Sequence, residues 1–241
     1  MDFGFYGEVI WRLLGGLPMT LNIAFVSVAI GAVFAVLLAL MQQSGVAPLV
    51  WFSRAYVFVF RGTPLLVQMF LIFYGLSQFP EIRASWAWTY LRQPYFCAVL
   101  ALAMNTAAYT AEILRGGLQS VPFGQVEAAR ACGMSRLTLY RRIVLPIAIR
   151  QALPAYGTEL ILMVRATALA SIITIMEITG IAQKINSETF RAIEVFVCAG
   201  AIYLAINFLL SRVVMALEHW LTPHLRAMPH EQLLAKVGDK L

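Results

Sequence analysis

Residues 17–41, LPMTLNIAFVSVAIGAVFAVLLALM, form an apolar run that contains no Asp, Glu, Lys or Arg. A helix of about 25 residues crosses the roughly 30 Å hydrocarbon core of a bilayer with some tilt. Four further apolar runs follow, at residues 56–77, 95–113, 153–176 and 193–215. Because a lipid-embedded chain must satisfy its backbone hydrogen bonds internally, the sequence predicts an all-α membrane protein with five transmembrane helices.

The composition supports a membrane protein and excludes a separate soluble catalytic domain. Of the 241 residues, 61% are hydrophobic and 12% are charged, and the mean hydropathy is +0.77. Soluble domains carry about twice this share of charge. No lysine follows a glycine-rich phosphate loop, and we find no nucleophile with a base, no paired catalytic carboxylates and no metal-ligand spacing. We therefore expect no catalytic residue, no metal site and no cofactor in this chain.

The distribution of basic residues predicts the orientation. With the N-terminus outside, the inner segments hold eleven Lys and Arg and the outer segments hold five. Basic residues accumulate on the cytoplasmic side, and five spans place the two ends on opposite sides. The N-terminus lacks the basic start of a cleaved signal peptide, so we expect it to stay attached. Residues 1–220 then form one transmembrane domain, and residues 221–241 form a cytoplasmic tail.

The longest inner loop is unusually rich in structure. Residues 120–154 read SVPFGQVEAARACGMSRLTLYRRIVLPIAIRQALP and predict two short helices. The first covers residues 124–132 and ends at Gly133, which is suited to the left-handed conformation after a helix. Ser135 caps the second helix, which Pro146 is expected to interrupt. The apolar residues of that helix follow helical spacing, at Leu137, Tyr140, Ile143 and Val144.

Two interpretations of this loop come from its local pattern. The segment AARACGMSRLTLYRR has the glycine turn, capping serine and arginines of a DNA-binding helix-turn-helix, which would make the chain a membrane-anchored regulator. Against this, such a domain needs a third helix and a core of its own, and membrane spans begin shortly on either side. The second interpretation is a plain surface loop that its arginines hold in the cytoplasm.

A third interpretation rests on a family resemblance. Glu127, Ala128, Ala129 and Gly133, followed by IVLP at residues 143–146, match every fixed position of E-A-A-x3-G-x9-I-x-L-P. This pattern resembles the EAA loop of permease subunits of bacterial ABC importers. The segments FRGTPLLVQ (60–68), MNTAAYTAEI (104–113), RGGLQSVP (115–122) and ALASIITIMEITG (168–180) are similar to those of polar amino-acid permeases of the histidine, octopine and nopaline group. The resemblance covers residues 18–220.

The resemblance implies a multi-pass inner-membrane protein with the type I importer permease fold, a periplasmic N-terminus and a cytoplasmic C-terminus. Its partners would be two ATP-binding subunits that hold ATP and Mg, a periplasmic substrate-binding protein, and a homologous permease subunit or a second copy of this chain. No nucleic acid would bind. The cargo would be a basic amino acid (arginine, histidine, lysine or ornithine) or an opine (octopine or nopaline). Residues 115–152 would couple the permease to the ATPase. The residues that match this role are Glu127, Ala128, Ala129, Gly133, Arg136, Leu145 and Pro146.

Two ionisable residues lie inside the fourth apolar run. A charge at the centre of a span costs roughly 2.5–3.5 kcal/mol on insertion scales, so Glu159 and Arg165 each need a partner or a wet cavity. Six residues turn a helix by about 240°, so we expect the two to face different surroundings. Glu159 either balances a cationic substrate group or pairs with an arginine near the inner rim. Arg165 either binds a substrate carboxylate or contacts the second permease.

Polar residues in the second and third runs complete the expected substrate path. Asn105, Thr106, Tyr109 and Thr110 form one polar stripe, which either lines a path or joins helices through hydrogen bonds. Irregular backbone is predicted around Thr63 and Pro64, where it must be buried in protein or line a cavity. Near the inner end of its span, Glu112 is expected either to snorkel to the interface or to pair with Arg115. The expected substrate-path residues are Glu159, Asn105, Thr63, Gln68 and Tyr109.

Overall fold

The computed structural model describes residues 3–221, and every regular element in this range is helical. The fold class predicted from the sequence is therefore confirmed. The elements are α1 (Phe3–Leu14), α2 (Leu17–Gln43), α3 (Ala47–Gly62), α4 (Leu65–Phe70), η1 (Leu71–Gly75), η2 (Leu76–Gln78), α5 (Pro80–Ala84), α6 (Trp88–Leu91), α7 (Pro94–Gln119), α8 (Phe123–Ala131), α9 (Arg136–Leu139), η3 (Tyr140–Val144), α10 (Leu145–Ala166), η4 (Thr167–Ile173), α11 (Ile178–Thr189) and α12 (Ala192–Leu221). The expected tail lies almost wholly outside the described residues.

Four helical stretches are long and apolar enough to cross a membrane, and there are five if the bent pair of α3 and the following helices is counted as one span. Three of the predicted runs correspond closely to single helices α2, α7 and α12. The predicted second span is wrong in two respects, since its first helix starts at Ala47 and the span bends by 104° after Gly62. The charge of Arg54, an exposed residue of α3, hid the early start. The adjacent Ser53 is buried and donates its hydroxyl to the Leu38 carbonyl at 3.0 Å.

The predicted start of the fourth span is also wrong. Helical structure is continuous from Arg136 through α9, η3, α10 and η4 to Ile173. The expected interruption at Pro146 does not occur. The preceding turn η3 is π-helical, and Pro146 occupies the first turn of α10, where a missing backbone N–H costs little. Pro154 likewise lies inside α10 without ending it.

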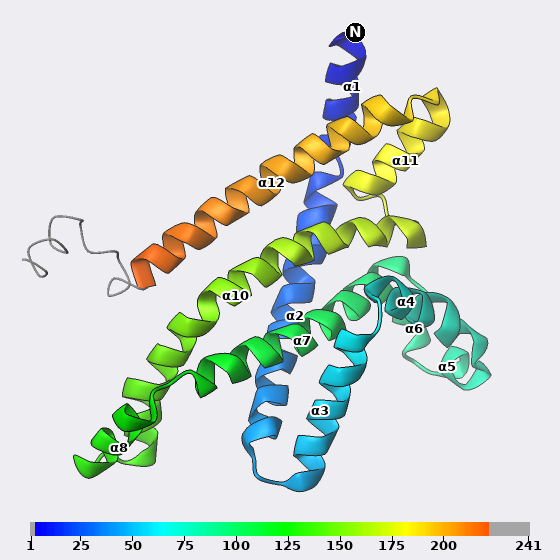
Figure 1. Cartoon of the computed structure of the whole chain (residues 1–241). Coiled ribbons are helices and arrows are strands. Elements are labelled where there is room, and N and C mark those ends of the chain that lie inside the picture. Colours follow the sequence, from blue (N-terminus) through cyan, green and yellow to red (C-terminus); the bar gives the residue numbers. More distant parts are fainter. Residues whose placement is uncertain (1–2, 222–241) are drawn as a thin grey trace, which may run out of the picture.

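The core forms where α7 crosses its neighbours. The α7 helix packs most extensively along α2 and next along α10 (Figure 1). The buried side chains of this region include Ile23 of α2, Leu102 of α7 and Met163 of α10, with many alanines between them. Small residues let transmembrane backbones approach closely, which is the main source of packing energy between helices in lipid.

A second cluster joins α1, α11 and the start of α12 at the N-terminal end of the molecule (Figure 1). Buried Glu177 caps α11 by accepting from the Gly180 amide at 2.8 Å and also accepts from the Tyr203 hydroxyl at 2.6 Å. Arg12 of α1 donates to Glu188 of α11 at 2.7 Å, and this hydrogen bond lowers the pKa of the Glu188 carboxyl below its ordinary value.

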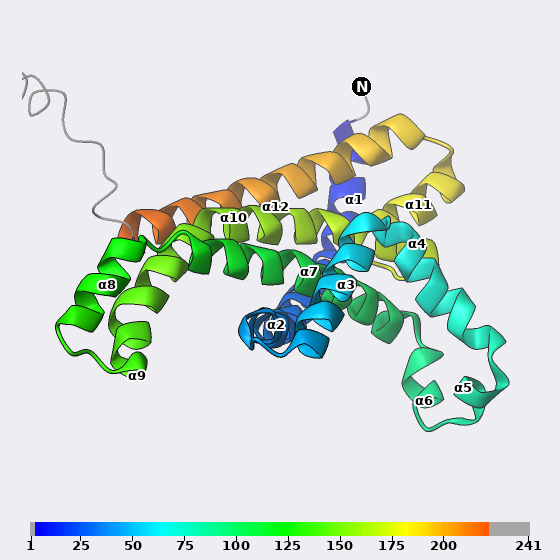
Figure 2. The ribbon, with the colours of Figure 1, turned by 60° about the horizontal axis from the view of Figure 1, so that its bottom comes forward.

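Two groups of short helices project from opposite ends of the bundle. Figure 2 shows α8 and α9 at one end and α5 and α6 at the other. The α8–α9 hairpin has its own small core, in which Ala129, Leu139 and Val144 are buried. Because helices α7 and α10 enter and leave this hairpin, it is attached directly to the two helices that form the centre of the molecule.

Candidate functional site

The site begins at the break between α3 and α4. Thr63 has extended backbone (φ −114°, ψ 144°), as expected for a residue that precedes proline, and Pro64 starts the new helix direction. The Thr63 hydroxyl donates back to the Val59 carbonyl at 2.8 Å. A break of this kind frees backbone carbonyls inside a span, and such groups must find new donors or line a cavity.

Gln68 supplies those donors. Its Nε2 group donates to the Phe60 carbonyl at 2.8 Å, to the Thr63 carbonyl at 3.1 Å and to the Thr63 hydroxyl at 2.8 Å. Its Oε1 atom accepts from Asn105 Nδ2 at 3.1 Å, and Asn105 also donates to the Phe60 carbonyl at 3.3 Å. Gln68 therefore holds the break closed and ties it to α7.

A cavity of about 630 Å³ lies beside the break, within the ~300–1,000 Å³ range of small-molecule sites. Its walls come from the α3–α4 connection, α7, α10 and the start of η4. It is lined by Arg61, Gly62, Thr63, Pro64, Leu65, Asn105, Tyr109, Glu159, Leu162, Met163, Arg165, Ala166 and Leu169. Four of the five residues expected on the substrate path are among these. Gln68, the fifth, lies behind the wall, where it supports Thr63 and Asn105.

Glu159 is the buried charge of this cavity. Its side chain is almost fully covered, Thr106 donates to its Oε1 atom at 3.0 Å, and no residue in the range 3–221 forms an ion pair with it. The alternative in which Glu159 pairs with an arginine near the inner rim is thus not observed within residues 3–221. Thr106 itself is 2% exposed. The polar stripe of α7 thus serves both expected purposes, because Thr106 joins α7 to α10 while Asn105 and Tyr109 line the cavity.

Arg165 lines the same cavity as Glu159, so the expectation that the two face different surroundings is wrong. The main lining face of α10 consists of Glu159, Leu162 and Ala166, at helical spacing. Arg165 lies beside this face, and its long side chain reaches the cavity although its backbone points away from Glu159. The side chain is exposed.

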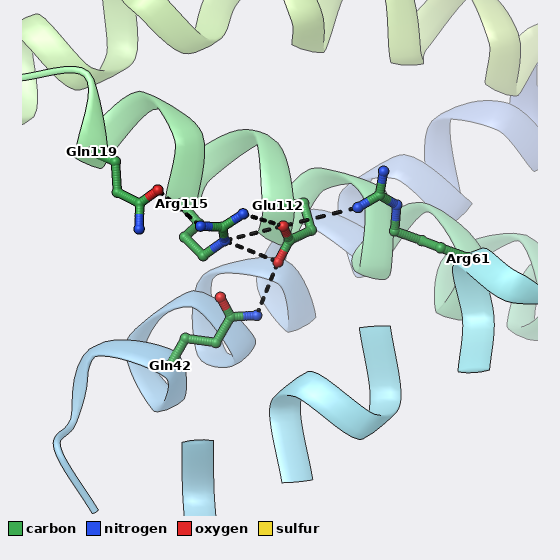
Figure 3. Close-up of polar contacts among 5 residues, drawn as sticks. All are labelled: Gln42, Arg61, Glu112, Arg115 and Gln119. Carbon is green, nitrogen blue, oxygen red and sulfur yellow. Dashed lines mark hydrogen bonds and ion pairs between the residues drawn. The ribbon is translucent and has the colours of Figure 1, made fainter. Parts of the chain in front are cut away.

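A polar network lies next to the cavity, around Glu112 (Figure 3). Arg115 donates to both Glu112 oxygens, at 2.6–3.1 Å, which confirms the predicted pair. Gln42 of α2 donates to the same carboxylate at 3.3 Å, and Arg61 Nη1 lies 3.9 Å from it. Arg61 also lies over the Tyr109 ring, 5.2 Å from its centroid. Arg61 was not among the expected site residues, although its charge at the edge of an apolar run was a usable signal.

The α8–α9 hairpin has the turn chemistry that the sequence predicts. Helix α8 closely matches the expected residues 124–132, and Gly133 has a left-handed backbone (φ +76°) that disfavours residues with a β-carbon. Ser135 accepts from the Thr138 amide at 3.3 Å and so caps α9. Of the apolar residues at the expected helical spacing, Leu137 and Tyr140 are exposed, and Leu139 is buried instead. The π-helical turn η3 rotates the helix relative to simple spacing.

The residues that match the coupling motif lie mostly on the surface of the hairpin. Glu127, Ala128, Gly133 and Arg136 are exposed, as is Leu145, whereas Pro146 is partly buried and Ala129 is buried in the hairpin core. A shallow groove of about 440 Å³ runs between α8 and the η3–α10 junction. Its lining residues are Gln125, Ala128, Ala129, Cys132, Met134, Arg142, Ile143 and Ile147. Such a groove can accept side chains of another protein.

A bundle of apolar helices, a broken span beside a charged cavity and a helical hairpin at one end define a membrane permease. The chain belongs to the family of binding-protein-dependent transport system inner membrane components, whose model matches residues 27–223. It is thus a multi-pass component of the bacterial inner membrane.

Known proteins are similar over nearly the whole chain. It is 58% identical over 225 residues to the octopine transport system permease protein OccM of Rhizobium radiobacter, and the aligned region covers 93% of this chain and 92% of that protein. It is 54% identical over 228 residues to the nopaline transport system permease protein NocM of Agrobacterium fabrum strain C58, with coverages of 94% and 95%. The structure superposes on the crystal structure of an amino acid ABC transporter with histidines, with a TM-score of 0.82 and 36% sequence identity. The superposed region covers 91% of this chain and 98% of that chain.

These similarities identify an ABC importer permease of the amino-acid and opine type, which is a transport subunit and not an enzyme. The interpretation as a DNA-binding regulator is wrong. The structure gives the physical reason, because α9 has only four residues and continues through η3 into the membrane span α10. A recognition helix needs a free face to enter the major groove.

Proposed function

We propose that this chain carries an opine or a basic amino acid through the cavity beside the α3–α4 break, as one of two permease subunits of an ATP-driven importer. The observation that carries the proposal is buried Glu159, which faces the cavity without a basic partner in residues 3–221. A buried carboxylate is stable only when a cation or strong donors compensate it. The cationic group of the cargo supplies this compensation, and the names of the similar permeases support such a cargo.

The proposed orientation places α11 on the periplasmic side and the α8–α9 hairpin in the cytoplasm. Residues 1–220 form the permease domain, and residues 115–152 the coupling loop. Two ATP-binding subunits, which hold ATP and Mg, dock on the hairpins of this chain and of its partner permease, which is a second copy or a homologue. A periplasmic binding protein delivers the cargo. When ATP closes the two ATPase subunits, the hairpins move together and the cavity changes the side it faces.

The continuous helix from Arg136 to Ile173 supports this mechanism. It carries Arg136 of the proposed coupling surface at one end and Glu159 and Arg165 of the cavity further along. A movement of the hairpin is therefore passed along one continuous helix to the residues that face the cargo.

Glu159→Gln tests the substrate role. In the complete transporter reconstituted in liposomes, we expect uptake of labelled arginine and octopine to fall about 10–100-fold, or ~1.4–2.7 kcal/mol, because the amide keeps the shape and removes the charge. A neutral amino acid that the transporter accepts should lose much less. Glu81→Gln, an exposed change on α5, is the control and should leave uptake unchanged. Equal losses for charged and neutral cargo would assign Glu159 a structural role.

Gly133→Val tests the coupling role. A β-branched residue at φ +76° costs ~1–2 kcal/mol or more, so the hairpin turn should distort while the spans still insert. We expect ATP hydrolysis to lose its stimulation by cargo-loaded binding protein. Glu127→Lys should have the same effect by reversing a surface charge. Gly133→Asn is the matched control, because asparagine tolerates the left-handed backbone conformation. Normal stimulation in both test variants would contradict the role.

A further inference from the structure

The cavity carries more positive than negative charge. Of the residues that line it, Glu159 is the one formal anion, whereas Arg61 and Arg165 are both cationic. A free basic amino acid has two cationic groups and one carboxylate, so its charge has the same sign as the net charge of the cavity. An N-carboxyalkyl derivative of arginine, such as octopine, has an additional carboxylate. Such a cargo offers one guanidinium group for Glu159 and two carboxylates for the arginines.

Both guanidinium groups are available for a ligand. Arg165 is exposed and forms no ion pair or side-chain hydrogen bond with any residue between 3 and 221. Arg61 lies 3.9 Å from Glu112, but Arg115 already holds that carboxylate at 2.6–3.1 Å (Figure 3). Arg61 is kept in place by stacking on Tyr109 and retains free N–H donors. Arginine is the side chain best suited to bind a carboxylate through two parallel hydrogen bonds.

We propose that Arg61 and Arg165 bind the two carboxylates of an N-carboxyalkyl amino acid and so select opine cargo over free basic amino acids. This inference rests on the proposed function, since it assumes that Glu159 binds the cationic end of the same molecule. It goes further by assigning the selection to the two arginines. Arg165 near the middle of a span is then explained, because its cost in the membrane is offset when a carboxylate of the cargo is bound.

The test measures equilibrium binding to the complete transporter in detergent, without binding protein, so that the specificity of the binding protein does not enter. The probes are labelled octopine, nopaline and arginine. We expect Arg165→Gln to weaken octopine and nopaline binding at least tenfold and arginine binding less than twofold. Arg165→Lys should restore binding only in part, because an ammonium group cannot form the paired hydrogen bonds. Arg61→Gln should show the same selectivity.

The matched control is Arg92→Gln, an exposed arginine at the end of α6 and away from the cavity. It should bind all three probes normally. Equal weakening of octopine and arginine by Arg165→Gln, or no weakening of either, would overturn the inference. Loss of the partner permease from the purified Arg165→Gln complex would also overturn it and would assign Arg165 to the subunit contact. If the wild type bound arginine and Glu159→Gln lost this binding, while Arg165→Gln bound octopine as the wild type does, the inference alone would fail. If the wild type bound none of the probes, the proposed function would fail with it.

Discussion

At the scale of single residues, Gln68 shows how a side chain near a cavity can act without lining it. Its amide satisfies the carbonyls that the break exposes and accepts from Asn105. Gln68→Met keeps the length of the side chain and removes these partners. Unsatisfied buried polar groups cost about 1–3 kcal/mol each, so we expect a clear loss of thermal stability of the detergent-solubilised protein.

Gln78→Met, at an exposed position on η2, is the control for this prediction and should leave the melting temperature nearly unchanged. A Gln68→Met protein that is as stable as the wild type would show that water or lipid replaces the lost hydrogen bonds at the break.

The sequence predicts which residues carry the chemistry of the site, but it predicts less well which residues they contact. Glu159 stands out because a carboxylate inside an apolar run needs an explanation, and Gly133 and Ser135 stand out because turns and caps depend on local sequence. The Thr106–Glu159 hydrogen bond joins α7 to α10 and depends on the relative rotation of two helices. Spacing along one helix carries no information about that rotation, which is also why Arg165 was expected to face elsewhere.

At the scale of helices, the crossing of α7 and α10 depends on Gly117. A β-carbon at this position would lie 2.6 Å from the Ala148 carbonyl oxygen and 3.0 Å from the Ala152 β-carbon. Gly117→Ala must therefore push the two helices apart, which typically costs ~1–3 kcal/mol. We expect a lower melting temperature and weaker transport.

The neighbouring residue provides a matched control for the crossing. A β-carbon at Gly116 would meet no atom within 4 Å, so Gly116→Ala should change stability by less than about 1 kcal/mol. Equal effects of the two substitutions would contradict the close contact between α7 and α10.

Three prolines show why helix boundaries are harder to predict than helices. Pro64 accompanies a 104° bend, Pro146 begins a helix after a π-helical turn, and Pro154 lies within α10. Each proline removes one backbone hydrogen-bond donor, and whether the helix bends there depends on how the neighbouring residues satisfy the carbonyl that loses its partner. At Pro64 the break is held by a side chain from the next helix and by α7, whereas at Pro146 the preceding turn adjusts locally. The composition of the spans predicts five of them, in line with the four or five of the structure, but it does not predict how each proline is accommodated.

At the scale of the whole molecule, the three cysteines can test the proposed orientation. Cys97 and Cys198 are buried, and Cys132 is exposed in the hairpin. We expect a membrane-impermeant maleimide to label inside-out vesicles at Cys132 and to leave intact cells unlabelled. Because Cys132 lines the hairpin groove, a docked ATP-binding subunit should slow the labelling.

A reporter on the other side completes this measurement. Ser187→Cys on α11, combined with Cys132→Ser, should be labelled in intact cells whose outer membrane has been permeabilised. Labelling of Cys132 from the periplasm would reverse the proposed topology and would separate the hairpin from any cytoplasmic ATPase.

The helix that runs without a break from Arg136 to Ile173 has a mechanical consequence. Its 38 residues include a π-helical turn, two prolines and a final 3-10 segment, with the coupling surface near one end and the cargo charges far along it. On the proposed mechanism, this continuous helix transmits movement in both directions. A conformational change caused by cargo binding in the cavity then reaches the ATP-binding subunits along the same helix that carries their closure to the cavity. The ATP-binding subunits therefore respond to bound cargo without any separate signalling element.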